Sequence, residues 1–98
     1  QSHYYKQEYE IKLSIVGDEK YILLVNGQPV QVEHSKEGYD VFKACEKDII
    51  SIDLRKCENE VSVFVADVFP FVSEPETGTK MFVQGGIKKL FELAGANE

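Results

Sequence analysis

Short runs of alternating apolar and polar residues, separated by tight-turn signals, constrain this chain to a β-rich fold. Three runs, residues 9–15, 50–54 and 61–65, place apolar side chains at every second position, which is typical of strands with one buried face. Residues 21–25 are apolar throughout, as expected for a strand that is covered on both faces. Residues 80–84 are expected to form a last strand.

The pair Asn26-Gly27 predicts a hairpin directly after the apolar run at residues 21–25. A type I′ turn needs positive φ at both central residues, and Asn-Gly tolerates this conformation best. Pro29, in the returning segment, has no N–H to donate to a ladder, so we expect this strand to lie or begin at a sheet edge. The turn is therefore interpreted as a structural element of the sheet.

Six or seven such strands within 98 residues predict a single all-β domain over residues 1–98. We expect an antiparallel β-sandwich, immunoglobulin-like or jelly-roll-like, that ends in a short helix over residues 87–94. Four apolar residues share one face of that helix, namely Ile87, Leu90, Phe91 and Ala94. Residues 1–7 are expected to be flexible, and the first residue, Gln1, suggests a domain or fragment of a larger or processed protein.

The charge balance argues against binding to nucleic acid or to an anionic membrane. The net charge is −6, from 17 acidic and 11 basic residues, and no cluster of five or more basic residues occurs. A nucleic-acid-binding surface needs a cationic face to displace counterions from phosphate, and anionic membranes likewise attract basic segments. Because no run of about 18 apolar residues occurs, no membrane insertion is expected.

The two cysteines, Cys45 and Cys57, are expected to be free thiols. The strand predicted between them covers roughly 20 Å when extended, whereas disulfide-linked Cα atoms lie only about 4.4–6.8 Å apart. The sequence does not fix the compartment, but two unpaired thiols favour a reducing, intracellular one.

The histidines and cysteines do not form a metal-binding pattern. Structural zinc sites use ligands paired two to four residues apart, whereas the inventory here is His3, His34, Cys45 and Cys57. A calcium site could be built from loop carboxylates, although solvated loop acids are the commoner explanation for Asp40, Glu46 and Asp48. No phosphate-cradling glycine loop occurs either, so we expect no metal and no cofactor.

Catalytic groupings are also missing from the sequence, and we expect a protein that is not an enzyme. No Gly-x-Ser-x-Gly nucleophile motif occurs. Cys45 and His34 could in principle form a thiol–imidazole pair, but a small buried thiol is the more common state of a cysteine. We therefore identify no catalytic residues.

The segment 61–72 is richer in apolar residues than one covered strand face requires. It holds Phe64, Phe69 and Phe71 within eight positions. One interpretation is that the helix expected at residues 87–94 packs over these rings. The other is a contact patch for another chain, because exposed aromatic patches mark interfaces. Pro70 would end the strand and turn Phe69 or Phe71 outward, so Phe69, Pro70 and Phe71 are the candidate binding residues.

The alternating run Tyr9–Val16 is followed by the turn Asp18–Tyr21, by the hairpin Val25–Gly27 and by His34. This order resembles the second half of a galectin-like jelly-roll lectin domain, and the resemblance covers residues 9–53. The sugar-binding signature of that family, a His-x-Asn-Pro-Arg strand with a later Trp and Glu-x-Arg, is absent, and the chain contains no Trp. The resemblance therefore implies a scaffold and transfers no functional residue.

The sequence predicts a non-catalytic β-sandwich that binds another protein or assembles with itself. The alternative is a carbohydrate-binding domain, since sugar sites usually offer an exposed aromatic ring for stacking. The rings considered for that role are Tyr4, Tyr5, Tyr9 and Tyr39.

Overall fold

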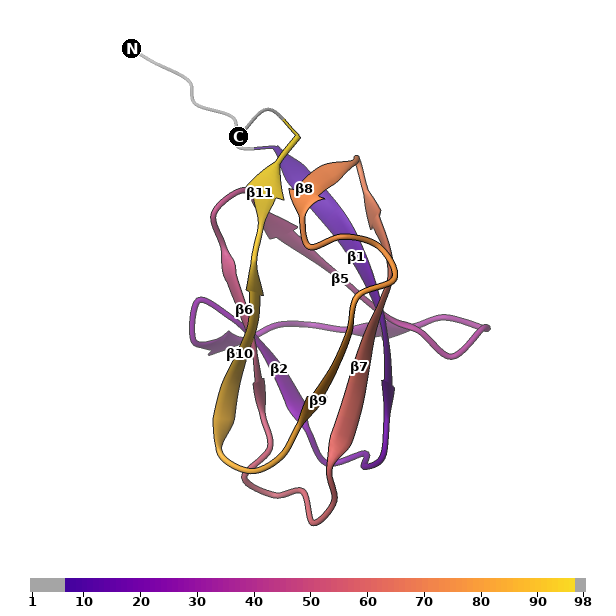
Figure 1. The fold of residues 1–98 in the computed structure, drawn as a ribbon, viewed down its shortest axis with the longest axis vertical. Coiled ribbons are helices and arrows are strands. Elements are labelled where there is room, and N and C mark those ends of the chain that lie inside the picture. The colour runs from indigo at the N-terminus through magenta and orange to yellow at the C-terminus, as the bar shows by residue number, and fades with distance from the viewer. Residues whose placement is uncertain (1–6, 97–98) are drawn as a thin grey trace.

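Two antiparallel sheets pack face to face in the computed structural model, which describes residues 7–96 (Figure 1). The strands in chain order are β1 (Glu8–Val16), β2 (Ile22–Val25), β3 (Gln28–Pro29), β4 (Glu33–His34), β5 (Asp40–Cys45), β6 (Ile49–Asp53), β7 (Val61–Phe69), β8 (Val72–Glu74), β9 (Lys80–Val83), β10 (Ile87–Glu92) and β11 (Ala94–Gly95). One sheet has the order β4-β5-β1-β7-β9 and the other the order β10-β6-β2-β3, while β8 and β11 pair by themselves.

The predicted antiparallel β-sandwich is confirmed. Within residues 7–96, seven strands have four or more residues, namely β1, β2, β5, β6, β7, β9 and β10. A search of the same residues finds no helix with the length and apolar character needed to cross a bilayer. Residues 1–7 were expected to be flexible. Of these positions, only Gln7 belongs to the described residues.

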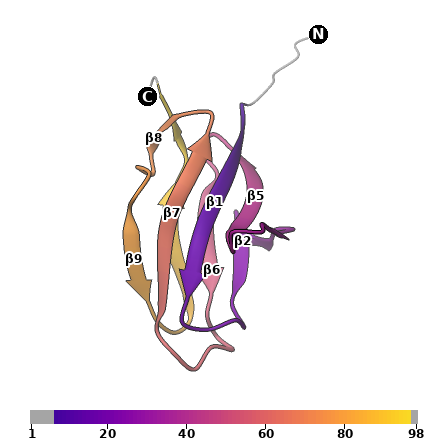
Figure 2. The same ribbon diagram turned by 90° about the vertical axis from the view of Figure 1, so that its right-hand side faces the viewer.

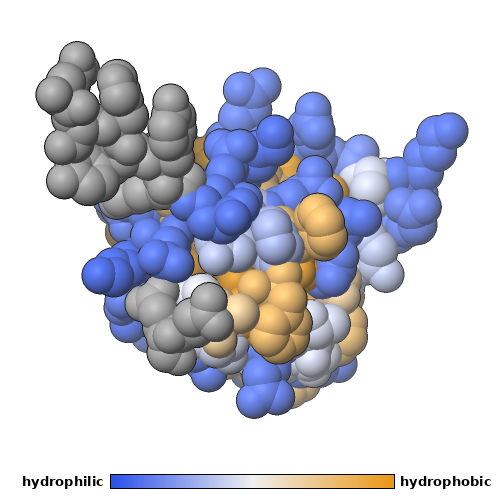
Figure 3. Space-filling model, turned by 90° about the horizontal axis from the view of Figure 1, so that it is seen from above, coloured by the Kyte–Doolittle hydropathy of each residue, from blue (hydrophilic) through white to orange (hydrophobic). Residues whose placement is uncertain are grey.

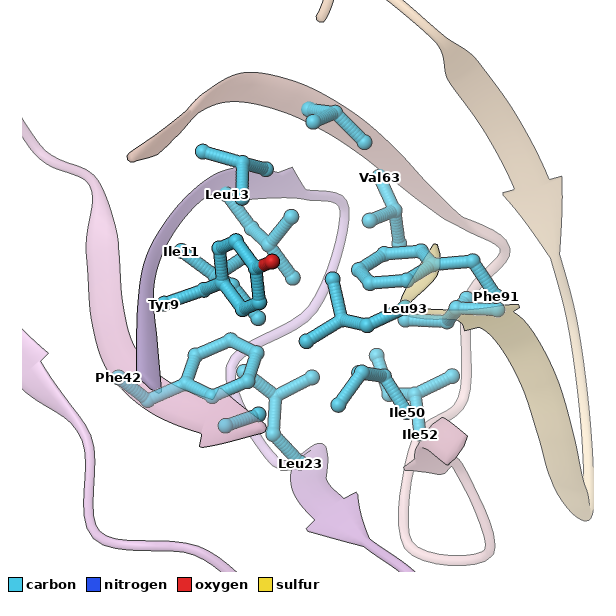
Figure 4. Packing of buried hydrophobic residues seen from close by; sticks show 14 of the residues in the cluster. Tyr9, Ile11, Leu13, Leu23, Phe42, Ile50, Ile52, Val63, Phe91 and Leu93 are labelled. Atoms are coloured by element: carbon cyan, nitrogen blue, oxygen red, sulfur yellow. The ribbon is translucent and has the colours of Figure 1, made fainter. Parts of the chain in front are cut away.

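The core lies between the two sheets and follows from the alternation in each strand. Ile11 and Leu13 of β1 and Val63 of β7 point inward from the five-stranded sheet, and Ile50 and Ile52 of β6 meet them from the other sheet (Figure 4). All five side chains are fully buried, and burying a side chain of this size contributes about 1.5–3 kcal/mol. Figure 2 shows β1 and β7 in front of β6, so that the two sheets form separate layers.

The predicted helix over residues 87–94 is wrong, because this segment forms β10 and β11. β10 pairs with β6, and the register shifts by one residue between Lys89 and Phe91, so that Leu90 is a bulge. Both Leu90 and Phe91 are buried, whereas strict alternation would bury only one of two neighbours. Two consecutive inward residues, three and four positions after Ile87, reproduce the apolar spacing of a helix, which explains the error.

The Asn26-Gly27 hairpin has the predicted conformation, with φ of 51° and 81°. Pro29 lies in β3, which is the edge strand of its sheet, as expected. The side chain of Asn26 also has a role that the sequence did not suggest. Its Nδ2 donates to Asp48 Oδ1 at 2.9 Å, and its Oδ1 accepts from the backbone N of Ile49 at 2.9 Å. The turn is thus attached to the β5–β6 connection.

Both cysteines are free thiols with half-buried side chains. Cys45 is the last residue of β5 and Cys57 lies in the loop after β6. As the sequence predicted, a strand runs between them.

Candidate interaction surface

Phe69, Pro70 and Phe71, here named the β7-end patch, lie where β7 ends. Phe69 is 70% exposed and Phe71 is 76% exposed, whereas the adjacent Val68 and Val72 are buried. Proline cannot continue a ladder, and β7 stops at the residue before it. The expected end of the strand at Pro70 is confirmed, and both rings are exposed. Phe69 faces outward because β7 has a bulge at Ala66, which reverses the alternation of the strand.

The sequence also allowed a helix over residues 87–94 to pack over these rings. No such helix forms, because residues 87–92 are strand β10. β10 belongs to the other sheet and contributes Leu90 and Phe91 to the core. The surplus of apolar residues in segment 61–72 is therefore exposed to solvent at the β7-end patch.

Acidic side chains border the β7-end patch. Phe69 lies opposite Glu10 of β1, and the exposed Asp67 precedes it by two residues. On β5, the other neighbour of β1, Lys43 lies opposite Glu10. The Nζ atom of Lys43 is 3.9 Å from Glu8 Oε1. Figure 3 looks onto this end of the sandwich and shows apolar side chains gathered between hydrophilic ones. Lys12 of β1 likewise lies opposite Asp67. The patch is thus an apolar surface with a border of mixed charge.

A second group of exposed apolar residues lies on the outer face of the five-stranded sheet. Val16, Ser62 and Phe82 form one row across β1, β7 and β9, and Phe64 lies in the next row, opposite Lys80. We name Val16, Phe64 and Phe82 the outer-face cluster; all three are exposed. The sequence grouped Phe64 with the β7-end patch, but five residues of strand, roughly 16 Å, separate it from Phe69. Phe82 follows Lys80 by two residues, and this spacing on a strand was the signal that could have placed both on one exposed face.

The sequence did not reveal a polar cluster formed by Tyr21, Asp40 and His34. β4 pairs with β5 so that His34 lies opposite the buried Asp40, and His34 Nδ1 is 3.0 Å from Asp40 Oδ1. Tyr21 Oη donates a hydrogen bond to Asp40 Oδ2. Burial, and then the hydrogen bond to Asp40, raise the pKa of Tyr21 well above its usual range, so the phenol keeps its proton. The three residues come from separate segments, and only the folded chain brings them together.

This cluster ties the two sheets together. A buried carboxylate beside an exposed imidazole also occurs in catalytic sites, where it orients a general base for a nearby nucleophile. The thiol considered for that role is Cys45, but it lies at the opposite end of β5 from Asp40, roughly 16 Å along the strand. The fold therefore separates Cys45 from His34, and we interpret the cluster as structural.

Two of the acids considered for calcium, Asp40 and Asp48, have other partners. Asp40 belongs to the cluster just described, and Asp48 accepts hydrogen bonds from Asn26 Nδ2 and from the backbone N of Cys45, the latter at 2.7 Å. Among residues 7–96, no group of three or more His, Cys, Asp or Glu side chains is arranged to hold a metal ion.

Asp18 attaches the β1–β2 turn to the loop that precedes β7. Its Oδ1 accepts a hydrogen bond from the backbone N of Lys20 at 3.0 Å, and its Oδ2 accepts one from Glu58 N at 2.9 Å. These backbone donors, Lys20 first, stabilise the charged carboxylate and lower the pKa of Asp18 from 3.8 to about 2.

The lowered pKa of Asp18 predicts an acid-dependent loss of stability. A group whose pKa is depressed by folding stabilises the protein above its unfolded pKa, and this stability is lost as the pH falls through the folded pKa. We expect Asp18→Asn to be less stable than the wild type at pH 7 and the two to converge between pH 4 and pH 2. Urea denaturation at a series of pH values measures this. Glu19→Gln, which neutralises an exposed acid in the same turn, should show no such convergence; equal curves for the two variants would contradict the assignment.

The described surface thus contains two exposed aromatic regions and one hydrogen-bonded polar cluster between the sheets.

No protein-family model matches the chain, and no curated protein or solved structure matches it either.

Proposed function

We propose that this chain is a non-catalytic β-sandwich module that binds another protein through the β7-end patch. The observation that carries the proposal is the pair of exposed rings, Phe69 and Phe71, held on either side of Pro70. Large exposed apolar patches with polar borders are typical of protein interaction sites. Aromatic residues are also enriched at the centres of interfaces.

The surroundings of the patch indicate the chemistry of the partner. Glu10 and Asp67 lie beside Phe69, each opposite a lysine on a neighbouring strand, whereas the whole chain carries a net charge of −6. Complementary charge accelerates association and selects among partners. We therefore propose a partner with an apolar or aromatic contact surface and a net positive charge, whose association rate falls as the salt concentration rises.

The carbohydrate-binding alternative has less support among the described residues. Tyr9 is buried in the core and offers no ring for stacking, and Tyr39 is half-buried. Tyr4 and Tyr5 lie outside the described residues. A glycan array is the direct test of this alternative.

The variant Phe69→Ser/Phe71→Ser tests the proposed site. Moving an aromatic ring from water into an interface contributes about 1.5–3 kcal/mol, so losing both rings should weaken binding by roughly 10²–10⁴-fold. A phage-displayed peptide library selected on the wild type should yield sequences rich in aromatic and basic residues. Their dissociation constants can then be measured by calorimetry.

The matched control is Phe82→Ser, which removes a similarly exposed ring, 63% accessible, from another part of the surface. It should bind the selected peptides as the wild type does. Because both substitutions affect exposed side chains, thermal unfolding should show that each variant stays folded. The proposal fails if the library yields no binders, or if the binders retain their affinity for Phe69→Ser/Phe71→Ser.

A further inference from the structure

β9 is an open edge of the five-stranded sheet, with β7 on one side and no further strand on the other among residues 7–96 (Figures 1 and 2). Its sequence, Lys80–Val83, has three apolar residues of four and contains no proline. Its pairing with β7 runs without a register shift. Apart from Lys80 and its modest length of four residues, this edge lacks the devices by which proteins prevent strand pairing.

The other three edges of the two large sheets are protected. β3 contains Pro29 and has only two residues, and β4 is equally short. β10 contains the bulge at Leu90 and carries the exposed Lys88 and Lys89. Prolines, bulges, lysines and short length are the usual means of blocking edge-to-edge association. Among the edges of the two large sheets in residues 7–96, β9 is thus the one with more than two residues and neither a proline nor a bulge.

The backbone groups at the open side of β9 belong to Lys80 and Phe82. Val65 N donates to Thr79 O at 2.8 Å, and the same register continues through Met81 and Val83. Hydrogen-bonding direction alternates along an antiparallel strand, so the N–H and C=O groups of Lys80 and Phe82 face away from β7. Each copy therefore presents two donors and two acceptors at this edge.

We infer that two copies of the chain pair antiparallel along β9, which joins their five-stranded sheets into one continuous sheet. A two-fold axis opposite Met81 places Lys80 of each copy directly opposite Phe82 of the other. The two residues whose backbone groups point outward then exchange hydrogen bonds in both directions. The edge is thus self-complementary in its backbone groups.

The side chains fit the same arrangement. Within one copy, Lys80 Nζ already lies 5.5 Å from the centroid of the Phe82 ring, and an ammonium group over an aromatic face is an attractive contact. Pairing along β9 places such a contact across the two-fold axis. It also brings the outer-face clusters of the two copies together, so that the exposed Phe82 is covered on one side.

This inference goes beyond the proposed function, because it concerns β9 and not the β7-end patch. Its test is sedimentation equilibrium of the chain over a wide concentration range. The wild type should dimerise. In Phe82→Lys, the lysine at position 82 of each copy faces Lys80 of the other copy. These two like-charge pairs should weaken dimerisation at least tenfold.

The double variant Lys80→Glu/Phe82→Lys should restore dimerisation to within a few fold of the wild type. It places a glutamate opposite a lysine in each pair, and opposite charges directly across two strands attract. General repulsion cannot explain such a recovery, because the double variant has a larger net negative charge than the single variant. Thermal unfolding of each variant monitors the fold.

Phe69→Ser/Phe71→Ser serves as the second control and should leave the dimer unchanged. A wild type that stays monomeric at all concentrations overturns the inference, as does a dimer that is insensitive to Phe82→Lys. A dimer that Phe69→Ser/Phe71→Ser abolishes also overturns it, while still supporting the β7-end patch.

Discussion

Leu93→Ala should lower the free energy of unfolding by about 2–5 kcal/mol, the range for a leucine truncated in a well-packed core. The Leu93 side chain is fully buried (Figure 4). Its backbone is fixed as well, because Leu93 N donates to Asp48 O at 3.0 Å and Lys47 N donates to Leu93 O at 2.8 Å. The surroundings can therefore collapse little around the cavity. Urea denaturation followed by circular dichroism measures the difference.

Ile87→Ala is the matched control and should change the stability by no more than about 0.5 kcal/mol, since Ile87 is 51% exposed. Comparing the stabilities of Leu93→Ala and Ile87→Ala distinguishes a strand from a helix in the C-terminal segment. In a helix over residues 87–94, Ile87 would lie on the apolar face with Leu90, and Leu93 would lie away from it. A larger loss at Ile87 than at Leu93 would contradict the bulged strand β10.

Gly17→Ala should destabilise the fold by about 2–5 kcal/mol, through backbone strain and overpacking together. Gly17 has a φ of 126°, which L-amino acids rarely adopt. A Cβ at this position would collide with the backbone oxygen of Glu60 and would lie 3.2 Å from Val61 Cα. Because both obstacles are backbone, they cannot move aside as a side chain can. Differential scanning calorimetry measures the loss.

Gly38→Ala separates the two effects. Gly38 also has positive φ, 90°, but nothing lies within 4 Å of its Cβ position. The variant Gly38→Ala should therefore lose only the stability that the backbone conformation costs, about 1–2 kcal/mol of the free energy of unfolding. Similar losses at Gly17 and Gly38 would show that the close approach of the Glu60 loop does not contribute.

The sequence predicted the parts of the fold that depend on regular alternation. β1, β6 and the first half of β7 alternate without interruption, and each forms as expected. It failed at the bulge in β10, where one extra residue reverses the phase. A bulge depends on how a strand fits its partner, and β6 lies more than thirty residues earlier in the chain. A local pattern holds no information on that fit.

The candidate surface was predictable to the same degree. Pro70 indicated where β7 would end, because the effect of proline on a strand is local. The outward direction of Phe69 was not predictable in the same way, because it depends on the bulge at Ala66, where β7 pairs with β1. The outer-face cluster and the Tyr21–Asp40–His34 cluster were not predictable, because they depend on which strands become neighbours. Their members are ordinary residues within their own segments, and only strand order gives them a common location.

The position of β1 has a consequence for how the chain is made. β1 is the central strand of its sheet, between β5 and β7, and its partners on β7 lie roughly 50 residues later in the sequence. Closing contacts at such separation is slow. During synthesis on the ribosome, one edge of β1 remains unpaired until β5 has been made, and the other remains unpaired until β7 has been made. A nascent or truncated chain that stops before β7 therefore exposes an unpaired, apolar strand, which is the feature that chaperones shield and that drives aggregation.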